Sequence, residues 1–490
     1  MGYDSEKTDT QVVTVTPSQS DADSIIRADN VKLAELGYKS EFRREFSLLE
    51  TICFAFSIMG VIASVTSTLS FGLVNGGHVG MVFGWLIPCC FVMFVALSMA
   101  EMASSMPTSA GLYYFSSKLA PPRYAPLASW ITGWANVTGQ VTLVCGIDFT
   151  CAQMITTAIA VNTDGAVILS AGATYGILLA ILFSHGIGSS SPLRLSVFGS
   201  NFYAVGTTIA AIVSLLVLSD GNRASTADAF TLFENNSGWA SDGWTFMLAF
   251  TSPMWTLTGY DSAAHISEET SNAAYAAPIA IIVSVVGTAT LGWLTLIATS
   301  FAIPSISNIL STDLPLPMGQ VFLNVLGKRG MLAIWSFIIV VQYVTGAAQA
   351  VDASRVVFAF ARDNALPGSR LWKKMSPYTQ TPVNAVWFVI GASAICGVLG
   401  FSETALTSLA GLGRWAVPVG VIAVAWVSFI VVMLFFPPGQ TTNAQEMNYS
   451  VVIIMAVFIF ASVSWVFSAR HWFRGPIRNV DDTPTTSFKE

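Results

Sequence analysis

Two apolar segments of the chain carry small and polar residues where a rigid membrane helix would favour leucine and alanine. Residues 53–72 read CFAFSIMGVIASVTSTLSFG, and residues 250–270 read FTSPMWTLTGYDSAAHISEET, with Pro253 and Gly259 in mid-segment. A helix that breaks inside a membrane exposes N–H groups that suit a carboxylate and C=O groups that suit an ammonium. A proline kink satisfied by neighbouring helices is the alternative for either segment. The presence of two breaks favours a binding site.

Ionisable residues inside apolar segments are the second set of candidates, because a charge in a bilayer is costly and often functional. Asp148 lies in the third segment, where it either lines an outer vestibule or sits at a helix end. Asp352 and Arg355 stand at i,i+3 spacing in the eighth segment, which favours a structural ion pair. Glu268 closes the sixth segment and is interpreted as a gate or solvent contact. His265 titrates near neutral pH in principle, but a lone histidine is usually structural.

The four histidines and six cysteines form no pattern typical of a metal site or a catalytic centre. The cysteines lie in apolar stretches without C-x-x-C spacing and are interpreted as small buried hydrophobes. A membrane enzyme would need paired histidines, a His/Glu metal motif or a serine with a base. A channel would need filter loops or rings of charge. We therefore expect no metal, no cofactor and no enzymatic activity.

The composition identifies the environment in which these residues must be positioned. Of 490 residues, 53% are hydrophobic and 10% are charged, whereas soluble domains carry about 25% charged residues. The net charge of −6 provides no basic face for nucleic acid. The chain is therefore predicted to be a polytopic protein of the lipid bilayer.

Apolar segments of the length needed to span a bilayer follow one another at short intervals. Their length excludes a membrane β-barrel, whose strands are short and alternating, and favours an α-helical bundle. The polar residues before the first segment predict that no signal peptide is present. We count eleven spans, near residues 52–74, 79–100, 126–160, 167–186, 195–218, 244–264, 277–303, 331–361, 383–401, 415–436 and 450–469.

Loop charges predict the orientation, because basic loops stay in the cytoplasm. The acidic loop 219–243 falls on the opposite side from most basic loop residues, which places the N-terminus in the cytoplasm. Eleven spans would leave the C-terminal tail outside, although its arginines predict a cytoplasmic tail. Residues 402–414 are too short to cross ~30 Å of hydrocarbon. We hypothesise that a helix and its loops are missing between Leu409 and Gly413.

Several long motifs resemble the amino acid–polyamine–organocation superfamily, and within it the fungal amino acid, γ-aminobutyrate and choline permeases. The resemblance extends over nearly the whole chain from about Asn30 onward. The motifs are LAELGYKSEFRREFS (33–47), SIMGVIAS (57–64), EMASSMPTSAGLYYF (101–115), SWITGWANVTGQ (129–140), GYDSAAHISEET (259–270), SRVVFAFARDNALPGS (354–369) and FSARHWFRGP (467–476).

The resemblance implies the leucine-transporter-type inverted repeat, with twelve spans of which the tenth is absent here. It divides the chain into a cytoplasmic tail (1–46), a first repeat of spans one to five (47–218) and an extracellular loop (219–243). A second, incomplete repeat of spans six to nine (244–412) follows, then the last two spans (413–470) and a cytoplasmic tail (471–490).

In that family the first and sixth spans unwind around the substrate. Tyr260 would supply an aromatic wall, which suits a quaternary ammonium through cation–π contacts, and Asp261 would open the following half-helix. Carried onto this sequence, the substrate-binding residues are Ser57, Ile58, Met59, Gly60, Val61, Trp255, Thr256, Leu257, Thr258, Gly259 and Tyr260. The gating or coupling candidates are Asp148, Asp261, Glu268, Asp352 and Arg355.

The resemblance implies a secondary active transporter of the plasma membrane that imports an amino acid or a related amine such as γ-aminobutyrate or choline. Alternating access with proton symport is expected by analogy, since the fifth span contains no lysine of the kind that some bacterial relatives use for coupling. The missing span favours an alternative, in which the chain is a non-transporting nutrient sensor or an inactive truncated permease.

Overall fold

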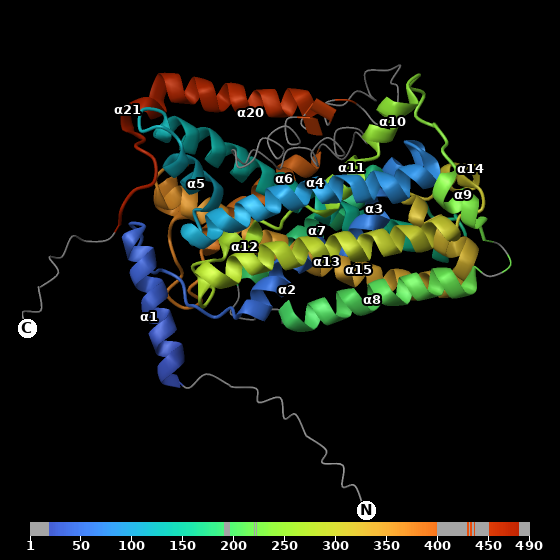
Figure 1. Ribbon diagram of the computed structural model, residues 1–490, viewed down its shortest axis with the longest axis horizontal. Coiled ribbons are helices and arrows are strands. Elements are labelled where there is room, and N and C mark those ends of the chain that lie inside the picture. Colours follow the sequence, from blue (N-terminus) through green and yellow to red (C-terminus); the bar gives the residue numbers. More distant parts are fainter. Residues whose placement is uncertain are drawn as a thin grey trace, which may run out of the picture.

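The protein is an all-α polytopic membrane protein, as the sequence predicts. The computed structural model describes residues 19–190, 197–219, 221, 223–398, 429–430, 432–433, 436 and 450–479. Within these residues the regular elements are helices. Two isolated β-bridges also occur, Phe46–Thr270 and Asn75–Asn235. The long helices run along a common direction (Figure 1).

In the described part of the chain, seven helices or joined helix pairs are long and apolar enough to cross a membrane. The broken sixth segment is not among them, because it consists of the short helices α10, α11 and α12. The spanning elements are α2 (Leu48–Met59) with α3 (Val61–Val74), α4 (Gly77–Ser105), α6 (Ala125–Asn162), α7 (Ala171–Ser190), α8 (Val197–Leu218), α13 (Ala273–Phe301) and α15 (Pro317–Arg362). The shorter helices of the sixth, ninth and eleventh segments are α10 (Asp242–Leu248), α11 (Thr251–Thr256), α12 (Ser262–His265), α17 (Val383–Gly397) and α20 (Ser450–Ser464).

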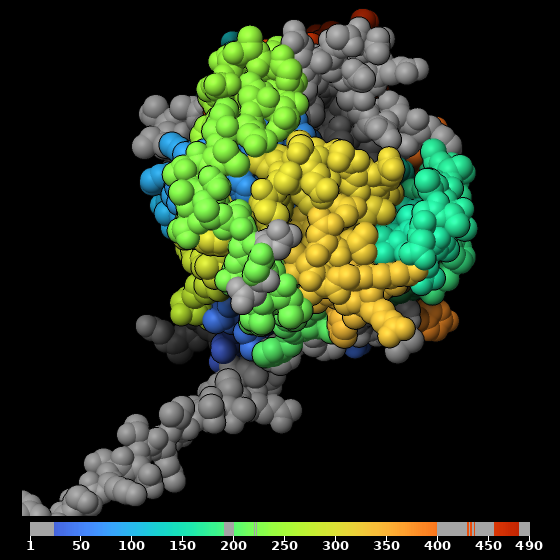
Figure 2. Space-filling view, turned by 90° about the vertical axis from the view of Figure 1, so that its right-hand side faces the viewer, coloured from blue at the N-terminus to red at the C-terminus, as the bar shows by residue number. Residues whose placement is uncertain are grey.

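The remaining short elements mark the two ends of the bundle (Figure 1). We call the end that carries α1 (Gln19–Glu35), α5 (Gly111–Leu119), α12 and α21 (Arg470–Trp472) the tail face. We call the opposite end, with α9 (Thr226–Thr231) and α14 (Ile306–Leu310), the loop face. In Figure 2 the loop face is toward the viewer, with the green chain around α9 beside the yellow start of α15.

Both terminal segments lie on the tail face. The amide of Asn479 donates to the carbonyl of Gly37 (2.9 Å), and the amide of Lys39 donates to the Asn479 side chain (2.7 Å). The amide of Ile477 donates to Asp363, which directly follows the eighth span (3.1 Å). The end of the eighth span and the residues that follow α21 therefore meet at the tail face.

The described contacts leave the count of eleven spans and the hypothesis of a missing helix as predictions. The junction between Leu409 and Gly413, and most of span 415–436, lie outside the described residues.

Close helix packing in the core depends on glycines that face aromatic rings. Gly292 of α13 lies against the indole of Trp85 on α4, and Gly133 of α6 lies against the ring of Phe360 on α15. A Cβ at either glycine would overlap the ring. Small residues of this kind let membrane helices approach closely, and here they bring α13 against α4 and α6 against α15.

Candidate functional site

The first span breaks at Gly60, which ends α2 and begins α3. Its φ of 47° is left-handed, a conformation that costs other residues about 1–2 kcal/mol. A Cβ there would lie 2.5 Å from Oγ1 of Thr345 on α15. The same hydroxyl donates to the carbonyl of Ser57 (2.9 Å), and the Ser64 hydroxyl donates to the carbonyl of Met59 (2.8 Å). Side chains therefore satisfy two carbonyls near the break.

The second break separates α11, which ends at Thr256, from α12, which begins at Ser262. Gly259 lies between them with φ 102°, and a Cβ at this position would overlap the side chain of Ile58. The two breaks are therefore in contact with each other, although about 200 residues separate them in the sequence.

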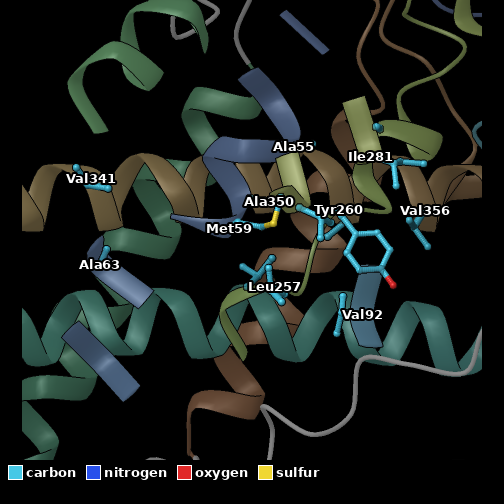
Figure 3. Close-up of a cluster of buried hydrophobic side chains, with 14 of the residues drawn as sticks. Ala55, Met59, Ala63, Val92, Leu257, Tyr260, Ile281, Val341, Ala350 and Val356 are labelled. Carbon is cyan, nitrogen blue, oxygen red and sulfur yellow. The ribbon is translucent and has the colours of Figure 1, made fainter. Parts of the chain in front are cut away.

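The residues around the two breaks are buried in the centre of the bundle. Met59, Leu257 and Tyr260 belong to one continuous core cluster, which Figure 3 shows in close-up. Trp255 is half-buried, and its ring lies against Gly146 of α6. The first N–H groups of α3 have no partner within the helix, so they suit a carboxylate beside aromatic side chains. Whether these residues bind a substrate stays a prediction.

Two buried ion pairs lie at the tail face. Arg362 donates to both oxygens of Glu268 (3.0 Å each), which also accepts from the Thr108 hydroxyl and the Ser109 amide (3.1 Å each). Burial alone would raise the pKa of Glu268, but Arg362 and these hydrogen bonds outweigh it, so the pKa lies below its ordinary value. The pair therefore joins the sixth span, the eighth span and the loop before α5.

The second ion pair corrects a prediction. Arg355 donates to both oxygens of Glu269 (2.7 and 3.2 Å) and not to Asp352. The i,i+3 spacing favoured an Asp352–Arg355 pair because it describes neighbours on one helix and gives no information about partners on other helices. Asp352 is fully buried. On the sixth segment, Asp261 lies 3.5 Å from His265.

A second polar cluster ties both tails to the end of the eighth span. Asp363 accepts hydrogen bonds from the phenols of Tyr38 and Tyr113 (2.9 Å each) and from the amide of Ile477. Burial and the neighbouring carboxylate raise the pKa of both phenols well above the ordinary value, so both phenols stay protonated and donate. The guanidinium of Arg362 lies 4.1 Å from the centre of the Tyr38 ring.

Asp148 lies in neither of the two places that the sequence suggested. It is fully buried within α6, and its carboxylate lies 3.1 Å from Nδ1 of His185 on α7. A vestibule or a helix end would have exposed it to water. In the described residues, no group of three or more His, Cys, Asp or Glu side chains is placed to hold a metal ion.

A cavity of about 840 Å³, its open mouth included, runs between α2, α7, α8 and α15. It reaches Ser57 beside the first break, His185 and Tyr343 at mid-depth, and Glu269 and Arg355 toward the tail face. Sequence reasoning did not select Tyr343 or Thr345. The available signal was the polar run QYVTG (342–346) in an otherwise apolar helix.

We expect Thr345→Val to loosen the first break, because it leaves the Ser57 carbonyl without its donor while keeping the side-chain volume. An unmade buried hydrogen bond costs about 1–3 kcal/mol, so uptake should fall by about tenfold in initial rate. Thr290→Val is the matched control, since the Thr290 hydroxyl only donates to its own helix at an exposed position. Equal uptake by the two variants would remove Thr345 from the site.

Comparison with known proteins adds independent evidence. The model of the amino acid permease family matches residues 46–417. An uncharacterized amino-acid permease of Schizosaccharomyces pombe is 35% identical, over 97% of this chain and 94% of the relative. The amino-acid permease BAT1 of Arabidopsis thaliana is 32% identical, over 93% of this chain and 98% of the relative. A BAT1 homolog of Oryza sativa subsp. japonica is 34% identical, over 92% and 96% respectively.

Proposed function

Because the chain belongs to the amino acid permease family and is thus an integral membrane transporter, we propose that it imports an amino acid or a related amine by alternating access. The contact between the two helix breaks, where Gly259 lies against Ile58, carries this proposal. It brings the N-terminus of α3 and the unwound residues 257–261 to one place inside the membrane. Such a place suits a zwitterion.

In this proposal the N–H groups at the start of α3 bind the substrate carboxylate. Carbonyls at the ends of α2 and α11 face the ammonium group. Trp255 and Tyr260 form the aromatic wall, which extends the substrate class to γ-aminobutyrate and choline through cation–π attraction.

The two tail-face ion pairs act as the inner gate of the proposed cycle. The Glu268–Arg362 and Glu269–Arg355 pairs must separate before substrate leaves toward the tail face. The basic loops support a cytoplasmic location for this face and for the N-terminus. We place the protein in the plasma membrane, with proton symport as the driving reaction, and Asp261 and Asp352 remain coupling candidates.

One observation supports the second candidate, a non-transporting sensor or an inactive truncated permease. The alignment with the S. pombe relative covers 513 residues, which is longer than this chain of 490, so the relative contains residues that this chain lacks.

Uptake of labelled compounds by permease-deficient cells separates the two candidates. We expect saturable uptake of at least one labelled amino acid, and a competition panel of γ-aminobutyrate, choline, basic amino acids and polyamines then ranks the substrates. Protein that reaches the membrane but accumulates none of these compounds at any concentration would favour the sensor or the truncated permease.

A further inference from the structure

A carboxylate and an imidazole meet inside the membrane bundle, away from the two ion pairs of the tail face. Oδ2 of Asp148 lies 3.1 Å from Nδ1 of His185, and the side chains are 0% and 1% exposed. Both residues lie on helices that are long enough to cross the bilayer. Burial of such a pair costs free energy. Its presence inside the bundle therefore suggests a functional role.

Each member of the pair has an atom that takes part in no hydrogen bond among the described residues. These atoms are Oδ1 of Asp148 and Nε2 of His185. With Nδ1–H donating to the carboxylate, Nε2 of the neutral imidazole is a free proton acceptor. The pair then has a net charge of −1, and a proton on Nε2 makes it neutral.

Several ionisable groups lie on the described helices that pack against this pair. Tyr343 of α15 lies 4.5 Å from His185, ring centre to ring centre, and its hydroxyl bonds to Ser184 (2.9 Å). The packed helix α15 also carries Asp352, Arg355 and Arg362 toward the tail face and Lys328 and Arg329 toward its other end; Arg355 pairs with Glu269 and Arg362 with Glu268. The thiols on α6 and α17 belong to Cys145, Cys151 and Cys396.

One turn of α15 joins this pair to the first helix break. Thr345 holds the carbonyl of Ser57, and the next residue, Gly346, lies against Oδ1 of Asp148, where a Cβ would overlap the carboxylate. Gln342 donates to the carbonyl of Ile147 in the same contact (2.9 Å). A movement of this turn therefore changes the surroundings of the break and of the pair together.

The cavity supplies a route for water. It touches His185 and Ser57 and extends to Glu269 and Arg355 at the tail face. Water that enters through an open gate can reach the imidazole without crossing the packed core between α6 and α15.

We propose that the Asp148–His185 pair is the proton-binding site that couples proton entry to substrate transport, an inference that rests on the proposed transport function. Nε2 of His185 accepts a proton from hydronium when the site faces outward, which releases a water molecule, makes the pair neutral and favours its burial. When the inner gate opens, Nε2 returns the proton to cavity water as hydronium, and the pair regains its charge of −1. One proton crosses in each cycle, and no covalent bond other than N–H changes.

The test uses the full chain in proteoliposomes with a uniformly labelled amino acid mixture as the probe and a trapped pH-sensitive dye. Two assays are compared: counterflow at equal pH on both sides, and accumulation under an inward gradient of one pH unit with the membrane potential clamped. For one proton per neutral amino acid, we expect wild-type protein to accumulate label about tenfold and to acidify the lumen.

We expect Asp148→Asn and His185→Gln to lose gradient-driven accumulation and the dye signal, while counterflow stays above background. His78→Gln is the matched control, because it removes a buried histidine that bonds to Ser300 far from the pair. Accumulation by both variants at the wild-type level would overturn the proposal, as would loss of counterflow in both, which indicates a structural role. Wild-type counterflow without gradient-driven accumulation overturns the proton site alone, whereas absence of both overturns the transport function as well.

Discussion

Gly60→Leu and Gly259→Leu should each abolish amino acid uptake while the protein still inserts into the membrane. Both glycines have left-handed φ values, 47° and 102°, which cost a leucine about 1–2 kcal/mol. The new side chain at position 60 meets Thr345 and the one at position 259 meets Ile58. Overpacking of this kind costs about 1–3 kcal/mol, and it fills the space where the two breaks expose backbone groups.

Gly206→Leu on α8 is the control for these variants. Gly206 is exposed and a Cβ there would meet no atom within 4 Å, so uptake should stay at the wild-type level. Surface labelling and thermal unfolding of purified protein distinguish loss of the site from loss of the fold. Normal uptake by either break variant would show that the substrate site is wrongly placed.

Arg362→Ala should give the largest loss of stability. It leaves the buried carboxylate of Glu268 without its cation, and removal of one partner of a buried pair costs about 3–5 kcal/mol. Because the pKa of Glu268 is lowered in the folded state, its stabilising contribution is complete above the unfolded pKa and disappears as the pH falls through the folded pKa. The free energy of unfolding should therefore be compared at neutral pH.

The exposed pair Lys328–Asp164 provides the control for this loss, since its two side chains are 38% and 80% exposed. Lys328→Ala should cost about 1 kcal/mol or less. Replacement of both buried partners, Glu268→Gln with Arg362→Gln, should recover part of the stability because no unpaired charge remains. A loss for Arg362→Ala as small as that for Lys328→Ala would mean that the pair does not hold the tail face closed.

Local sequence predicted the helices well where hydropathy changes sharply. The third span, predicted at residues 126–160, is α6 (Ala125–Asn162). The eighth span was predicted to begin at residue 331, and α15 (Pro317–Arg362) consists of two helices joined across non-helical backbone at Gly327 (φ 66°), the second of which begins just before that residue.

Ion pairs were predicted poorly because a charged side chain takes its partner from the helix that packs against it. Arg355 is paired with Glu269, 86 residues away, rather than with Asp352 on the next turn. Asp148 and His185 were considered separately, and nothing in their local sequence indicates that α6 and α7 bring them together.

The sequence by itself determined that the chain is a helical membrane protein, where its helices lie and that glycine and proline interrupt two of them. These properties depend on composition over about 20 neighbouring residues, which is the length that a bilayer imposes. Only the tertiary structure decided that the two breaks touch, that Arg362 and Arg355 pair with Glu268 and Glu269 and that Asp148 meets His185. Those contacts join helices that are distant in the chain, and they follow from side-chain packing, which no local pattern encodes.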